Sequence, residues 1–118
     1  MTGGVCSGAE ESGSTALTAL ISSRLLCFAH CGDCRGVLYR DGRVVQVTRE
    51  HSPECDIEKN RIEMLGGRII ALRSDTPRVM GVLNMTRAVG DFGLKPFIIP
   101  NPEVALFSQF SPPDENFC

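Results

Sequence analysis

One carboxylate in the sequence stands where either a metal ligand or a turn residue is expected. Asp33 follows the apolar run that ends at Cys31, and it lies between Gly32 and Arg35 in the segment G-D-C-R. Carboxylate oxygens are ligands that Mg²⁺ and Mn²⁺ favour. An Asp in a tight turn after a strand also bonds to backbone amides. The residue types alone leave both roles open, and a single carboxylate cannot hold two divalent ions.

Two cysteines near this turn have the spacing C-x-x-C, which is used by zinc sites and by thiol-redox motifs. Cys31 and Cys34 form this pair. A zinc site needs two more ligands, and His30 and His51 are not at paired spacing. A redox motif needs a helix that begins after the first cysteine, whereas residues 35–40 predict a strand. We therefore expect reduced thiols without metal, and keep a zinc or thiol-redox module as a less favoured alternative.

Further charged residues with a possible role in the site lie between residues 58 and 91. Asp91 closes the segment R-A-V-G-D, where it either faces a cleft or anchors a loop, and we expect the loop anchor. The forked donors of Arg87 suit carbonyls and carboxylates of the same loop. Glu58 and Arg61 are three residues apart on a predicted helix. We expect them to form a partly buried ion pair with a structural role.

The elements that must position these residues are mostly strands. Apolar, β-forming runs predict strands over residues 15–22, 24–31, 68–72, 78–85 and 103–107. Asp41-Gly42 between residues 36–40 and 43–48 predicts a hairpin. These strands with one or two helices predict an α+β fold rather than a regular β-α-β alternation.

The predicted helix covers residues 54–65, and a shorter helical turn is expected over residues 86–90. Gly66-Gly67 supplies the stop signal for the longer helix. Its apolar residues recur on one stripe, which is expected to face the core. The members of this stripe are Ile57, Ile62, Met64 and Leu65.

Length and composition limit the chain to one small, folded domain without a strong charge. It has 118 residues, 42% of them hydrophobic and 22% charged, with a net charge of −2 and an isoelectric point near 5.6. Nothing in this balance favours nucleic acid or an anionic membrane as a partner. No apolar run approaches the roughly 18 residues of a membrane span. The first residues lack a signal-peptide pattern, so we expect an intracellular, cytoplasmic or nuclear, location.

Four segments of the sequence, in order, resemble motifs of one known protein family. Residues 12–16 (S-G-S-T-A) resemble S/D-G-S-T-A, and residues 31–38 (C-G-D-C-R-G-V-L) resemble V-G-D-S-R-A-V-L. Residues 58–67 (E-K-N-R-I-E-M-L-G-G) resemble E-x-x-R-I-x-x-x-G-G, and residues 78–91 (R-V-M-G-V-L-N-M-T-R-A-V-G-D) resemble R-V-x-G-x-L-x-V-S-R-A-x-G-D. Four ordered segments are far more specific than one G-D-x-R turn. Together they resemble the middle of the catalytic domain of the type-2C family of metal-dependent Ser/Thr protein phosphatases.

The resemblance implies a fold and a reaction. The implied fold is an antiparallel β-sandwich with helices outside, so we expect a partial sandwich with a flanking helix. The implied reaction is hydrolysis of phosphoserine and phosphothreonine in phosphoprotein substrates by water activated at a two-metal centre, with Mn²⁺ or Mg²⁺ as cofactor. Asp33 matches the family's aspartate that helps to hold an additional, weaker metal ion. We expect this auxiliary metal role for Asp33 in a complete domain.

Most of the family's metal ligands have no counterpart in the sequence. The resemblance places them in D-G-H-G-G, D-G-x-W-D and D-N segments, whereas the one D-G here is the expected hairpin turn. We therefore assign no catalytic residue and expect the chain alone to be inactive. Residues 1–11 are predicted to be a flexible tail, and residues 12–118 the central part of a catalytic domain truncated at both ends. The alternative is a non-catalytic, phosphatase-like binding or regulatory protein.

Overall fold

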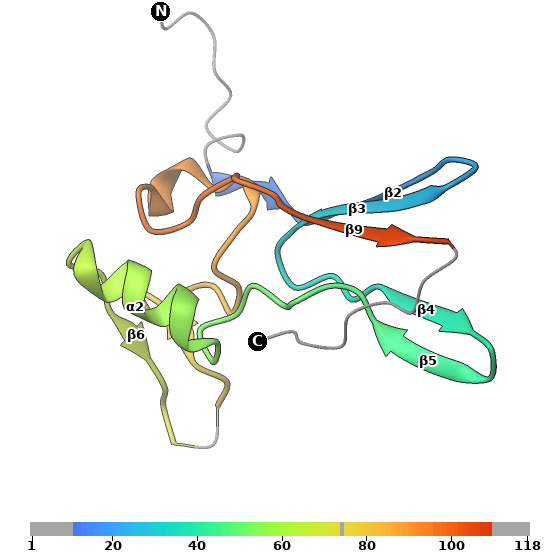
Figure 1. Cartoon of the computed structure of the whole chain (residues 1–118). Helices are drawn as coiled ribbons and strands as arrows, with labels where there is room; N and C mark the ends of the chain where they lie inside the picture. Colours follow the sequence, from blue (N-terminus) through green and yellow to red (C-terminus); the bar gives the residue numbers. More distant parts are fainter. Residues whose placement is uncertain (1–10, 74, 110–118) are drawn as a thin grey trace, which may run out of the picture.

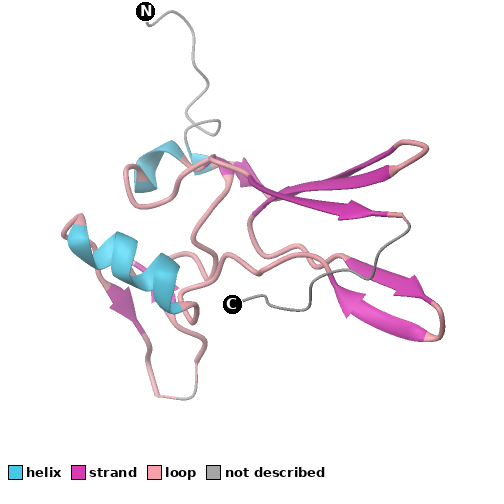
Figure 2. Cartoon of the chain, viewed as in Figure 1, coloured by secondary structure: helices cyan, strands magenta, loops and turns pink. Residues whose placement is uncertain are grey.

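The computed structural model describes residues 11–73 and 75–109, which form short antiparallel strand pairs, one longer sheet and a helix (Figures 1 and 2). The predicted tail over residues 1–11 therefore lies almost wholly outside the described residues. None of the helices within these ranges has the length and apolar character that crossing a membrane requires. The elements, in chain order, are β1 (Gly13–Ser14), β2 (Ala16–Ile21), β3 (Leu25–Cys31), β4 (Val37–Arg40), β5 (Arg43–Gln46), α2 (Asp56–Met64), β6 (Ile69–Ile70), β7 (Arg78–Val79), β8 (Val89–Gly90), the 3₁₀ helix η1 (Phe92–Leu94) and β9 (Glu103–Ser108).

The three longest strands form an antiparallel sheet in the order β2-β3-β9. Cys27 of β3 lies opposite Leu20 of β2 and Leu106 of β9. The β2–β3 turn is closed by Ser22, whose backbone N–H donates to the carbonyl of Leu25 at 2.9 Å. These strands confirm the predictions for residues 15–22, 24–31 and 103–107, because apolar β-forming runs of this length have few alternatives to pairing.

The hairpin β4–β5 is a second layer facing this sheet (Figure 1). Its two turn residues, Asp41 and Gly42, both have positive φ, 53° and 76°, as a two-residue hairpin turn requires. The Arg40 guanidinium of β4 donates to the carbonyl of Ser108 in β9 at 3.0 Å and so ties the layers together. The D-G prediction is confirmed, and the antiparallel pairs with a flanking helix have the expected α+β architecture.

Helix α2 begins two residues later and ends one residue earlier than predicted. Gly66 follows with φ of 88°, and the N–H of Gly67 donates to the carbonyl of Ile62 at 3.0 Å, which ends the helix. The predicted apolar stripe is wrong. Of the four residues of that stripe only Ile62 is buried. Met64 is 87% exposed, and Ile57 and Leu65 are exposed as well.

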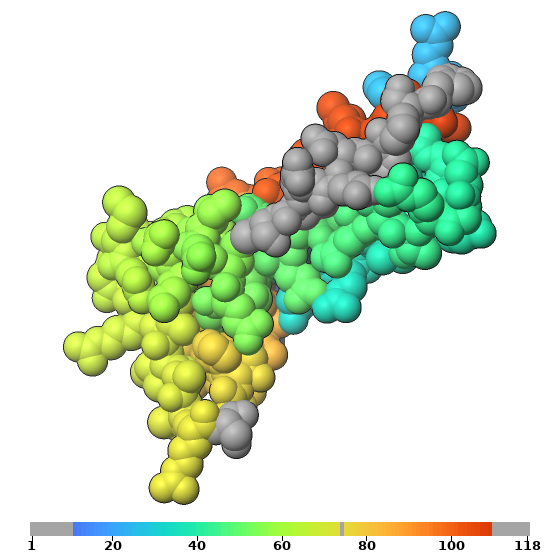
Figure 3. All heavy atoms as spheres, turned by 60° about the horizontal axis from the view of Figure 1, so that its bottom comes forward, coloured from blue at the N-terminus to red at the C-terminus, as the bar shows by residue number. Residues whose placement is uncertain are grey.

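The small core lies between α2 and the loops that follow it. Its buried members are Ile62, Val79, Ala88 and Ile98. The segment after α2 projects from the rest of the molecule (Figure 3, yellow) and contributes only two residues to each of β6 and β7. The strands predicted over residues 68–72 and 78–85 are therefore present but much shorter than expected.

The helical turn predicted over residues 86–90 is wrong. Val89 and Gly90 are extended and pair with Ser14 and Gly13 as β8 against β1. A short 3₁₀ helix, η1, follows instead at residues 92–94. Long-range pairing to β1 decides the conformation here, and it places residue 91 beside the start of the described chain.

Candidate metal site around Asp33

The turn that carries Asp33 is fixed by the residue before it. Gly32, the buried residue that follows β3, has φ of 107°, a conformation that residues with a side chain rarely adopt. A Cβ at this position would lie 2.4 Å from Cγ2 of Thr15 and 3.1 Å from the carbonyl oxygen of Arg87. The backbone of the G-D-x-R turn is thus packed closely between two other segments. This packing fixes the backbone position of Asp33.

Asp33 lines a hollow of about 580 Å³, together with residues from three other segments. The other lining residues are Glu11, Ser12, Gly13, Ser14, Thr15, Leu83, Met85 and Asp91. Within residues 11–73 and 75–109 the Asp33 carboxylate has no hydrogen-bond or ion-pair partner, so the bonds to backbone amides that a turn-capping Asp makes are not found in that range. Its oxygens remain available to a cation or to water.

Asp91 lies in the same hollow, and its backbone and side chain do different things. Its backbone N–H donates to the carbonyl of Ser12 at 2.8 Å, and its carbonyl accepts from Leu94 at 3.0 Å, so among the described residues the loop is held here by backbone bonds and not by the side chain. Its carboxylate does not cap η1 and lies against Gly13, where a Cβ would be 2.0 Å from Oδ2. A second carboxylate therefore faces the hollow beside Asp33.

The residues of this hollow fit a hard divalent cation in kind but supply few ligands. Carboxylate oxygens are what Mg²⁺ and Mn²⁺ prefer, and Asp33 and Asp91 offer them, with Glu11 also lining the hollow. Two such ions at one centre need more oxygen ligands than these side chains provide. The hollow is suited to one weakly held ion or to part of a larger site.

A buried carboxylate, Glu58, holds the loop behind this turn. Arg87 Nε donates to Glu58 Oε1 at 2.6 Å and Nη2 to Oε2 at 2.9 Å, while Thr86 Oγ1 donates at 2.9 Å. Arg61 is a weaker partner at 3.4 Å. The predicted Glu58–Arg61 pair is confirmed, but Arg87 is the principal partner. Arg87 also donates to the carbonyl of Asn101 at 3.0 Å, as expected of a loop-anchoring arginine.

The charge on Glu58 is stabilised although its side chain is fully buried. Burial works to raise the pKa of this carboxyl, but hydrogen bonds from Arg87 and Thr86 and the charges of Arg87 and Arg61 outweigh it and lower the pKa to about 2. The hydrogen bonds to Glu58 raise the pKa of Arg87. The pair remains ionised at neutral pH.

The two histidines come together, contrary to the expectation from their spacing. The rings of His30 and His51 stack with centroids 4.4 Å apart and planes 6° from parallel. His51 Nε2 lies 3.2 Å from Glu103 Oε2. The strand register brings residues 30 and 103 together, and the chain after the hairpin returns residue 51 to the G-D-x-R turn. The spacing of the two histidines along the chain does not predict this arrangement.

Acid is expected to destabilise the fold in two overlapping pH ranges. Burial, then the charges of Arg87 and His30, lower the pKa of His51 from 6.5 to about 4, against Glu58 and Glu103, which raise it. The unfolded chain therefore binds this proton more readily, and stability falls as pH drops from 6.5 towards 4. The lowered pKa of Glu58 removes stability from 4.5 towards 2. Urea unfolding at a series of pH values measures both losses. Constant stability between about pH 7 and 5 would contradict the first of them.

The two cysteines of the C-x-x-C spacing have separate partners. The Cys34 thiol donates to Thr15 Oγ1 at 3.1 Å, whereas buried Cys31 contacts the carbonyl of Ile99 at 3.8 Å. Burial raises the pKa of the Cys31 thiol, which disfavours the thiolate that redox chemistry and zinc both need. Both thiols are free in the described part of the chain.

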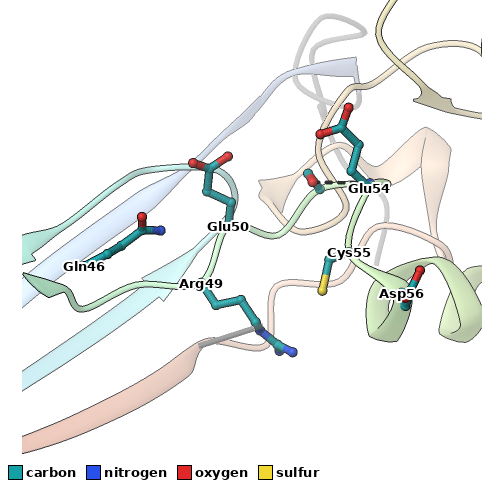
Figure 4. Close-up of a pocket in the computed structure, with 7 residues that line it drawn as sticks. Gln46, Arg49, Glu50, Glu54, Cys55 and Asp56 are labelled. Carbon is teal, nitrogen blue, oxygen red and sulfur yellow. Dashed lines mark hydrogen bonds between the residues drawn. The ribbon is translucent and has the colours of Figure 1, made fainter. Parts of the chain in front are cut away.

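A second hollow, of about 400 Å³, lies between β5 and the start of α2 (Figure 4). Its charged lining residues are Arg49, Glu50, Glu54 and Asp56. Arg49 points away from Glu50 (Figure 4), and its guanidinium reaches Glu103 Oε1 at 2.7 Å. The N-terminal end of α2 attracts an anion, whereas the neighbouring carboxylates repel one. The lining of this hollow therefore does not favour one class of ligand.

Comparison with known proteins agrees with the motifs. The family model described as protein phosphatase 2C matches residues 6–117. Protein phosphatase 2C 37 of Arabidopsis thaliana is 41% identical over 106 residues, which cover 90% of this chain and 25% of that protein. Probable protein phosphatase 2C 78 of the same plant is 44% identical over 94 residues, covering 80% and 22% of the two chains.

Two solved structures share the fold. A sex-determining protein of C. elegans has a TM-score of 0.78 and 36% identity, over 83% of this chain and 24% of its own. Serine-threonine phosphatase 2C from Toxoplasma gondii has a TM-score of 0.72 and 25% identity, over 86% and 39%. The chain spans about a quarter of the length of the first two plant relatives. On the family match and these likenesses, the chain belongs to the protein phosphatase 2C family.

Proposed function

We propose that residues 12–118 are the central part of a catalytic domain that removes phosphate from phosphoserine and phosphothreonine in proteins. The observation that carries the proposal is the Asp33 carboxylate, which lines a hollow beside Asp91 without a partner among the described residues. Support for the reaction class comes from relatives named protein phosphatase 2C. An intracellular location stays a prediction.

In this proposal Asp33 helps to hold an auxiliary Mn²⁺ or Mg²⁺ ion, and Asp91 faces the same space. When bound, such ions supply an activated water and offset the charge of the phosphoryl oxygens. The chain's own part is positioning. Gly32 gives the turn its left-handed conformation, while Arg87 and Glu58 hold the loop behind it. The principal metal ligands are proposed to come from segments outside these 118 residues.

A segment exchange tests whether this part of the chain serves catalysis. Residues 12–107 would replace the matching segment of Arabidopsis protein phosphatase 2C 37, to which the chain is 41% identical. The chimaera is expected to dephosphorylate a phosphothreonine peptide with Mn²⁺. Asp33→Asn is expected to raise the Mn²⁺ concentration for half-maximal activity by roughly tenfold, because one charged ligand of a weak site is lost. Peptide dephosphorylation across a Mn²⁺ titration provides the measurement.

Asp41→Asn is the matched control, since Asp41 lies in the hairpin turn and Asn tolerates its positive φ. We expect this control to keep the parental Mn²⁺ dependence. An equal Mn²⁺ dependence for the Asp33 variant would contradict the auxiliary metal role. A folded but inactive chimaera would favour the non-catalytic, phosphatase-like alternative. Manganese-dependent release of p-nitrophenol from p-nitrophenyl phosphate by the pure 118-residue chain would contradict the proposal that the principal metal ligands come from segments outside these 118 residues.

A further inference from the structure

His51 is fully buried and is bonded twice to the residue that precedes Asp33. Its backbone N–H donates to the carbonyl of Gly32 at 3.0 Å, and the N–H of Gly32 donates to its side-chain Nδ1 at 3.0 Å. Its own carbonyl accepts from the N–H of Thr86 at 2.9 Å. One residue thus links the G-D-x-R turn to the loop that carries Arg87.

These contacts define the protonation state of the His51 imidazole. Because Nδ1 accepts a hydrogen bond from a backbone N–H, it carries no proton, and the proton of the neutral ring is on Nε2. Nε2 then donates to Glu103 Oε2 at 3.2 Å. Glu103 is held in turn by Arg49 at 2.7 Å. A carboxylate on one ring nitrogen selects the tautomer that the other nitrogen needs.

The same cluster is not arranged to hold a metal ion. The ligand atoms of His30, His51 and Glu103 lie within 4.8 Å of one another, but the two imidazole planes are almost parallel and stacked. An imidazole binds a metal through a lone pair in its own ring plane, so one ion cannot lie in both planes. His30 Nε2 also bonds to the carbonyl of Arg49 at 2.7 Å. Hydrogen bonding, rather than coordination, explains the cluster.

We propose that His51 is a positioning residue for Asp33. Its Nδ1 fixes the Gly32 N–H, the Gly32 backbone directs the next residue into the hollow, and Glu103 keeps the imidazole in the tautomer that accepts this bond. His30 stacks on the ring but makes no bond to the turn among the described residues, so we assign it no part in fixing Gly32. The use of Asp33 as a metal ligand rests on the proposed function, whereas the bond to Gly32 does not.

Two substitutions separate the functions of the two ring nitrogens. His51→Asn places an oxygen near the position of Nδ1 and keeps an acceptor for Gly32. His51→Gln places its amide near Nε2, which keeps a donor to Glu103 and removes that acceptor. His30→Gln is the matched control, since it changes an equally buried, stacked histidine and retains a donor to the Arg49 carbonyl.

The decisive measurements are NMR experiments on the whole ¹⁵N-labelled chain near neutral pH. We expect the His51 ring to show an unprotonated Nδ1 and a protonated Nε2. Exchange of the Gly32 amide is expected to be about tenfold faster in His51→Gln, as loss of one hydrogen bond predicts. It should stay within about twofold of the parent in His51→Asn and His30→Gln. Unchanged Gly32 exchange in His51→Gln, or a protonated Nδ1, would overturn the inference.

Manganese-induced line broadening of the Asp33 amide, measured on the same samples, links this contact to the metal. The concentration for half-broadening is expected to rise several-fold in His51→Gln and to recover in His51→Asn. Broadening that is equal in the parent, His51→Gln and His51→Asn would overturn the positioning role. If the parental Asp33 signal does not respond to Mn²⁺, the auxiliary metal role fails instead, and Gly32 exchange alone decides whether His51 fixes the turn.

Discussion

Replacing Glu58 by glutamine is expected to reduce the free energy of unfolding by about 3–5 kcal/mol, the range for breaking a buried ion pair by removing one partner. Glu58 is fully buried and accepts hydrogen bonds from Arg87 at 2.6 and 2.9 Å and from Thr86 at 2.9 Å. The substitution leaves the Arg87 guanidinium, 14% exposed, without its counter-charge. Equilibrium unfolding in urea near neutral pH measures the loss.

An exposed pair of the same kind provides the control. Arg35 donates to Glu50, but Arg35 is 65% exposed. Pairs in water contribute only about 0–1 kcal/mol, so Glu50→Gln is expected to change stability by less than about 1 kcal/mol. A loss for Glu58→Gln no larger than that for Glu50→Gln would show that the buried network is not what holds the loop to α2.

Local signals in the sequence were sufficient for the elements whose form depends on neighbours in the chain. Asp41-Gly42 determines its own turn through two positive φ angles, and the strands around it have no competing pattern. Helix α2 begins two residues from its predicted start, and it ends one residue from its predicted end because Gly66 provides its stop. The family motifs then identified Asp33 as a candidate ligand, although they did not predict what surrounds it.

Tertiary contacts decided what local signals could not. On α2 the inward positions are held by Glu58 and Ile62, while Met64 is exposed. The partners of Glu58 that lie in another loop, Thr86 and Arg87, were not predictable from the helix itself. Val89 is extended because it pairs with Ser14 of β1, which no helix propensity reveals. The contact of His51 with Gly32 depends on the path of the whole hairpin, so spacing along the chain gave no sign of it.

A single methyl group at Gly32 is expected to have a large effect on the candidate site. In Gly32→Ala the residue would keep φ of 107°, which costs about 1–2 kcal/mol for a residue with a Cβ. The added Cβ would lie 2.4 Å from Thr15 Cγ2, and overpacking of this kind costs about 1–3 kcal/mol more. Relief by a change of φ would redirect the chain that follows Gly32, which carries Asp33.

The expected result of Gly32→Ala is a loss of about 3 kcal/mol in the free energy of unfolding, the sum of strain and overlap. Gly42→Ala separates the two causes, since Gly42 has φ of 76° but no atom within 4 Å of an added Cβ. Only the conformational cost of about 1 kcal/mol applies there. Urea unfolding of both variants measures the difference. Equal losses would mean that the turn is not packed against Thr15, and Asp33 would then lack the rigid backbone on which its placement in the hollow depends.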